Sequence, residues 1–150
     1  MSYQETNITV SLTSYLLILG YYLIRLFQMY QDGGLVSGPL FRMWGIIIAA
    51  AIIVNIIASI LTNIILSIVH AVRTGSEEGA RFIEDERDKL IELKGVKSSY
   101  IAFSIGVLLA MLTFVFGQSP LVMFSLIILS SLMAEIIGDI TQIYLYRRGF

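Results

Sequence analysis

A single long charged segment, residues 73–97, constrains this chain more than any other feature of its sequence. The sequence on either side is apolar, and each side is long enough to cross a hydrocarbon core of about 30 Å twice. Of the 150 residues, 57% are hydrophobic and only 14% are charged, whereas soluble domains carry roughly 25% charged residues. A bilayer is therefore the expected solvent, and the sequence predicts an integral membrane protein.

Four apolar stretches predict transmembrane helices at about residues 8–30, 40–72, 98–116 and 121–146. Gly33-Gly34 and Gly117 to Pro120 favour turns within each half of the chain. Short turns favour antiparallel neighbours. We therefore expect an all-α, polytopic membrane protein. It would form one domain over residues 1–150, a four-transmembrane-helix bundle of two hairpins with a cytosolic amphipathic helix between them.

The basic residues predict the orientation of these helices. Eight of the ten Lys and Arg residues lie in segment 73–97 or at the C-terminus, and the other two are Arg25 and Arg42. Cytoplasmic loops carry an excess of Lys and Arg, so both termini and the charged segment are expected in the cytosol. Arg42, beside Trp44, is expected to anchor the outer interface. Arg25 is expected either to extend to that interface or to descend and counter Glu135.

The composition argues against several classes of function. The chain has no cysteine, which excludes disulfides, iron–sulfur clusters and thiol chemistry. Its one histidine, His70, disfavours a histidine-rich metal site, and a net charge of -1 gives no basic field for nucleic acid. We recognise no nucleophile–base pair and no glycine-rich phosphate loop. We therefore expect no enzyme activity, no cofactor and no metal.

The charged segment has the period of an amphipathic helix. Phe82, Ile83, Leu90 and Leu93 recur at helical spacing, opposite a charged face. Three interpretations are open: a solvated extension that positions the two hairpins, a docking surface for a cytosolic partner, or an acidic cation site. The candidate docking residues are Glu84, Asp85, Glu86, Arg87 and Asp88.

The same segment resembles a known group of proteins. The run from Glu84 to Asp88, followed by Ile91, Lys94 and the pair Ser99-Tyr100, is similar to small prokaryotic four-helix membrane proteins of the domain-of-unknown-function type. Those proteins carry an acidic DERD motif before the third helix, and they are often encoded beside a helix-turn-helix regulator. The resemblance implies a multi-pass protein of a prokaryotic cytoplasmic membrane with a regulatory role, and it implies no catalytic residues.

Two stripes of polar residues lie inside the predicted spans. A spacing of four residues keeps side chains on one helix face, and a carboxylate near the bilayer centre costs roughly 2.5–3.5 kcal/mol on insertion scales. The stripes could face each other as a proton or cation site, bind a small molecule or lipid headgroup, or only fix helix register through hydrogen bonds. The candidate residues are Asn55, Ser59 and Asn63 on the second span and Ser131, Glu135 and Asp139 on the fourth.

Small residues also recur every four positions on the last two spans. They are Ala102, Gly106 and Ala110 on the third span, and Ser130, Ala134 and Gly138 on the fourth. Such patterns let helices approach closely in lipid. We expect them to seal the second hairpin, although they could equally form a homodimer face.

Two functions therefore stay open from the sequence. The first is a non-enzymatic regulatory, sensory or accessory membrane subunit whose charged helix contacts a cytosolic regulator or a membrane-protein partner. The second is a proton- or cation-coupled transporter or channel that uses Glu135 and Asp139. Because 150 residues can barely surround a pathway, the second function would require a homo-oligomer.

Overall fold

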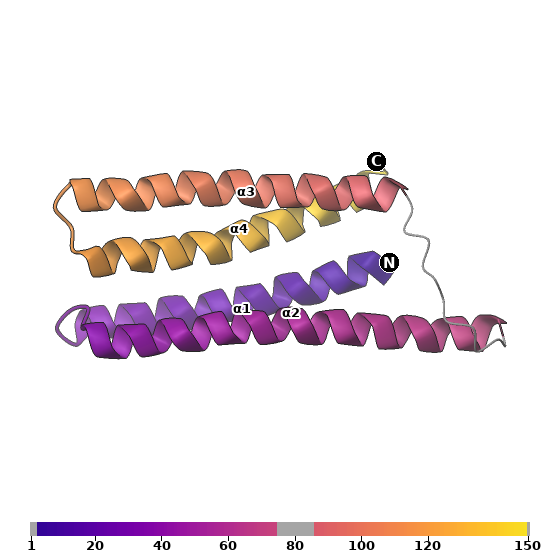
Figure 1. The fold of residues 1–150 in the computed structure, drawn as a ribbon, viewed down its shortest axis with the longest axis horizontal. Helices are drawn as coiled ribbons and strands as arrows, with labels where there is room; N and C mark the ends of the chain where they lie inside the picture. The colour runs from indigo at the N-terminus through magenta and orange to yellow at the C-terminus, as the bar shows by residue number, and fades with distance from the viewer. Residues whose placement is uncertain (1–2, 75–85, 150) are drawn as a thin grey trace.

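The computed structural model describes residues 3–74 and 86–149, which form four α-helices and, within those ranges, no strand (Figure 1). The helices are α1 (Tyr3–Gln31), α2 (Ser37–Thr74), α3 (Glu86–Val115) and α4 (Pro120–Arg148). Each is long and apolar enough, over its described part, to cross a membrane. The expected all-α four-helix architecture is confirmed.

The helices form two antiparallel hairpins, α1–α2 and α3–α4, that pack on each other through α1 and α4. Figure 1 shows both interhelical turns at one end, called here the turn end, and both chain termini at the other, the terminal end. It also shows α1 and α2 diverging toward the terminal end. The order of neighbours is therefore α2, α1, α4, α3, with the hairpin contact in the middle.

Glycines with positive φ make both turns possible, as their sequence indicates. Gly33 and Gly34 have φ of 117° and 105°, and Gly117 has φ of 86°, which residues with a Cβ rarely adopt. Ser119 then caps α4, since its side chain accepts a hydrogen bond from the Val122 N–H, and Pro120 occupies the first turn.

An aromatic and aliphatic core joins α1, α2 and α4 in the half of the bundle nearest the turn end. The side chains of Tyr22 and Leu40 are fully buried, and the ring of Trp44 lies 6.1 Å from that of Phe124. The Tyr22 hydroxyl donates a 2.7 Å hydrogen bond to the Ser125 carbonyl. The core members are Tyr15, Tyr22, Leu40, Met43, Trp44, Ile47, Leu132 and Ile136.

Close contact between small residues joins α3 to α4, as the repeat of small side chains predicts. A Cβ added at Gly106 would meet the Cβ of Ser130 at 2.5 Å, and one at Gly138 would meet the Gly95 carbonyl oxygen at 3.3 Å. Gly95 does not interrupt the helix but accommodates the side chain of Gln142. The helix of the third predicted span accordingly extends without a break from Glu86 to Val115.

Candidate functional site

The most buried carboxyl group of the predicted polar stripes is that of Asp139. This residue is only 8% exposed, although it lies in an apolar helix. The Ser11 hydroxyl of α1 donates a hydrogen bond to the carboxyl group. Its Oδ2 atom has no hydrogen-bond partner among the described residues. One oxygen of the carboxyl group is thus paired across the hairpin interface, and the other is buried and unpaired within the described residues.

Glu135 and Ser131 belong to the same stripe, but their side chains are exposed. Each step of four residues turns a helix of 3.6 residues per turn about 40° beyond a full circle. The stripe therefore passes from the exposed surface at Ser131 and Glu135 into the α1 interface at Asp139. The two carboxyl groups are close enough to interact electrostatically, yet only one of them is enclosed.

The three candidate residues of the second span, Asn55, Ser59 and Asn63, lie on α2, but their side chains are outside the described residues. For these three residues, therefore, only their position along the axis of α2 can be compared with α4. Trp44 contacts Phe124 near the turn end, and α2 and α4 both run from there toward the terminal end. Asn55 follows Trp44 at the same interval at which Glu135 follows Phe124, so the two polar stripes begin at similar depths.

The candidate docking residues differ in whether the structure describes them and in whether they are exposed. Glu84 and Asp85 lie outside the described residues. Glu86 and Arg87 are exposed in the first turn of α3. Asp88 faces the bundle instead, because the Tyr146 hydroxyl of α4 donates to its carboxylate at 3.0 Å. Of the described members, two are thus available to a partner and one holds the bundle together.

Tyr146 also contacts the side-chain oxygen of Gln4, so one hydroxyl joins α1, α3 and α4 at the terminal end. The sequence did not predict this cluster, since nothing in the local pattern distinguishes Tyr146 from an interfacial tyrosine. The spacing of the buried pair Tyr15 and Tyr22 was a clearer sequence signal for burial. They are seven residues apart, which is two helical turns, and therefore share one face of α1.

The face of α3 that points away from α4 combines exposed apolar and charged side chains. It consists of Glu86, Leu90, Leu93 and Lys97, and we call it the outward face of α3. Leu90 and Leu93 are 50% and 65% exposed. The opposite side is fixed, since Ile91 is fully buried. The segment is a helix with one side packed against the bundle and the other exposed.

In the part of the chain that the structure describes, no group of three or more His, Cys, Asp and Glu side chains comes together. No protein-family model matches the chain, and no curated protein or solved structure matches it either. The resemblance to the prokaryotic DERD-motif proteins therefore stays a prediction. What defines the class is the fold, a four-helix bundle compatible with a multi-pass membrane protein.

Proposed function

We propose that this protein is a non-enzymatic subunit of a prokaryotic cytoplasmic membrane, with both termini in the cytosol, that regulates or assists a partner protein. The partner would bind the outward face of α3. The observation that carries the proposal is the exposure of Leu90 and Leu93 in a charged, rigidly held segment of that helix.

The position of the segment supports the proposal. Residues 86–97 carry all the charged side chains of α3 and precede its apolar part. At 1.5 Å per residue these twelve residues extend about 18 Å along the axis, which puts the outward face mainly beyond the hydrocarbon core. Large apolar side chains exposed to water in this way are typical of protein-binding surfaces.

The spacing on the outward face supports the same conclusion. Its four residues lie at intervals of four, three and four, which is the pattern of anchors that a helix presents to a groove or to another helix. Glu86 and Lys97 have opposite charge at the two ends, which would fix the orientation of a partner. Because Ile91 and Asp88 already hold the helix, the partner would meet a preformed surface with little ordering cost.

Photocrosslinking in living cells tests the proposal. A photoreactive amino acid at Leu93 is expected to give a protein adduct of one defined mass, and Leu90→Glu is expected to abolish it. The matched control is the same probe at Leu108, which is 60% exposed on the apolar part of α3. Equal adducts at both positions, or an adduct that survives Leu90→Glu, would refute the docking surface.

A second candidate function rests on the unpaired Oδ2 atom of Asp139. This atom is buried without a hydrogen-bond partner among the described residues, and the exposed Glu135 lies one helical turn away. An intramembrane carboxyl group is a candidate proton or cation site by default. Since Glu135 is exposed in a single chain, a transporter or channel of this kind would need a second copy to cover it.

Flux into proteoliposomes distinguishes this second function from the first. A transporter is expected to lose proton or cation flux in Asp139→Asn and Glu135→Gln while the folded protein persists. Glu86→Gln, an exposed acid outside the apolar part of its helix, is the matched control and should keep full flux. If the wild-type protein shows no flux above empty liposomes, the second function is wrong.

A further inference from the structure

Two arginines are placed symmetrically about the turn between α1 and α2. Arg25 comes eight residues before Gly33, and Arg42 comes eight residues after Gly34. In an antiparallel hairpin, equal distances from the turn put two residues at the same depth. The apolar hairpin therefore brings two guanidinium groups to one level near the turn end.

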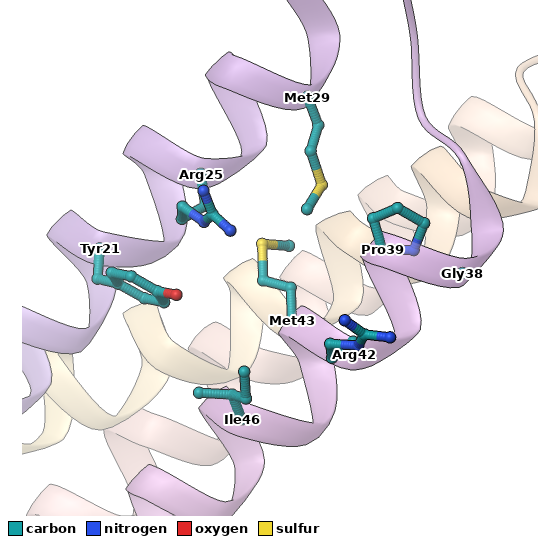
Figure 2. Close-up of a pocket in the computed structure, with 8 residues that line it drawn as sticks. All are labelled: Tyr21, Arg25, Met29, Gly38, Pro39, Arg42, Met43 and Ile46. Carbon is teal, nitrogen blue, oxygen red and sulfur yellow. The ribbon is translucent and has the colours of Figure 1, made fainter. Parts of the chain in front are cut away.

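The two arginines line a common cavity of about 290 Å³ between α1 and α2 (Figure 2). Figure 2 shows Tyr21 and Arg25 extending from α1 and Arg42 from α2, with the sulfur atoms of Met29 and Met43 between the two helices. The cavity thus has cationic groups on both sides and apolar walls.

The charges at this cavity have no compensation within the described residues. Arg25 donates only to the neutral side-chain oxygen of Gln28, at 3.3 Å, and neither arginine forms an ion pair with a described carboxylate. The acid nearby, Asp32, does not line this cavity but an adjoining one of about 260 Å³, which shares Arg25 with it. Two like charges at one depth, neither in an ion pair with a described carboxylate, create a field that favours an anion.

The first turn of α2 adds to this field. Gly38 and Pro39 line the shared cavity, which therefore opens onto the N-terminus of a helix that begins at Ser37. Helix N-termini carry partial positive charge and are common sites for phosphate, although here Pro39 has no N–H and the Leu40 N–H donates to the Val36 carbonyl at 3.2 Å. The positive end of the α2 dipole therefore adds to the charges of the two arginines, one on α1 and one on α2.

We propose that this cavity binds a phosphate group, that of an anionic phospholipid in the membrane leaflet at the turn end. The planar guanidinium forks of Arg25 and Arg42 suit phosphate oxygens. The apolar side of the cavity, with Met43 and Ile46, lies below the arginines along α2 and suits the glycerol and first acyl carbons. A phospholipid fits both the cationic part and the apolar part of the cavity, whereas a free phosphate ion fits only the cationic part.

Native mass spectrometry tests the proposal with the whole protein in detergent micelles. Phosphatidylglycerol and phosphatidylcholine with the same acyl chains are added in equal amounts. The wild-type protein is expected to retain one phosphatidylglycerol in preference to phosphatidylcholine. Arg25→Gln/Arg42→Gln is expected to lose this preference by about tenfold or more, since hydrogen bonds between charged groups are about twice as strong as neutral ones.

Two further variants make the result specific. Arg147→Gln/Arg148→Gln removes the same charge from the exposed terminal end of α4, and it should keep the lipid preference. Arg25→Lys/Arg42→Lys keeps the charge but loses the planar fork, and it should retain the lipid less well than the wild-type protein. Emission from Trp44, which is packed in the adjacent core, confirms that each variant is folded.

Inorganic phosphate distinguishes the two possible sources of the phosphate group. If millimolar phosphate raises the melting temperature of the lipid-free protein through Arg25 and Arg42, and phosphatidylglycerol is not retained, the lipid proposal is overturned in favour of a soluble anion. Equal loss of lipid from both glutamine double variants would also overturn it, because only total charge would then matter.

Discussion

The substitution Gly106→Ala tests how closely α3 and α4 must approach. The new Cβ would lie 2.5 Å from the Ser130 Cβ and 3.5 Å from its Cα. A Cβ atom is fixed to its backbone, so no rotation of the Ser130 side chain removes the overlap, and the helices must separate. Overpacking of a tight interface typically costs about 1–3 kcal/mol.

The chain offers a matched control for this effect. Gly45 lies on α2, and no atom lies within 4 Å of the position that a Cβ would take there. Gly45→Ala should therefore leave stability unchanged or raise it by up to about 1 kcal/mol through helix propensity. Relative to this control, Gly106→Ala is expected to destabilise the bundle by about 1–3 kcal/mol. Adding Ser130→Gly removes the opposing Cβ and should restore most of the loss.

Hairpin opening can be measured directly because the chain has no cysteine of its own. Cysteines introduced at the exposed positions Lys97 and Ile140 carry a donor and an acceptor dye, and the loss of energy transfer during titration with sodium dodecyl sulfate gives the free energy of separation. If Gly106→Ala and Gly45→Ala separate at the same detergent concentration, or if Ser130→Gly gives no rescue, the close-contact argument is refuted.

Three further substitutions test polar contacts that cross helices. Tyr22→Phe removes the 2.7 Å bond to the Ser125 carbonyl and is expected to lower the unfolding free energy by about 0.5–1.5 kcal/mol, measured by tryptophan fluorescence; an unchanged midpoint would show that ring burial alone holds the contact. Tyr146→Phe leaves the Asp88 carboxylate without its donor and should increase amide hydrogen exchange in the first two turns of α3, whereas unchanged protection would contradict a role in anchoring. Asp139→Asn removes a buried charge with an open oxygen and should stabilise the bundle by about 1 kcal/mol or more at pH 8; a loss of stability there would mean that the ionised form is already well paired.

The elements of this fold that depend on short-range pattern were predictable from the sequence. Paired glycines indicated the first turn, and Gly117 to Pro120 indicated the second, because positive φ and a proline at the start of a helix have local causes. The small residues around Gly106 and Ser130 likewise predicted close packing, and the structure places it between α3 and α4 rather than leaving it to a homodimer face alone. Such repeats specify contact because only side chains of that size allow it.

The arrangement of polar groups was less predictable, since it depends on the direction from which a neighbouring helix approaches. The spacing of Ser131, Glu135 and Asp139 gives one continuous stripe, but only the position of α1 determines that Asp139 is buried and Glu135 exposed. Asp88 is a similar case. In the sequence it is one of five charged neighbours, and only the hydroxyl of Tyr146 shows that it faces inward.

The contact between the two hairpins combines one polar pair at each of three depths along α1 and α4. Tyr22 bonds to Ser125 nearest the turn end, Ser11 to Asp139 further along, and Gln4 contacts Tyr146 at the terminal end. In lipid, where apolar contact alone provides little drive for association, such bonds and close packing hold helices together.

The middle pair differs from the other two because its carboxyl group can exchange a proton. When the Asp139 carboxyl group is protonated, the buried interface holds no charge there; when it is ionised, the unpaired Oδ2 carries charge into an apolar contact. The hairpin interface should therefore tighten on protonation. The proposed proton site and a structural contact would then be the same residue, and Asp139→Asn, which resembles the protonated form, should hold the hairpins in their closer arrangement whatever the external pH.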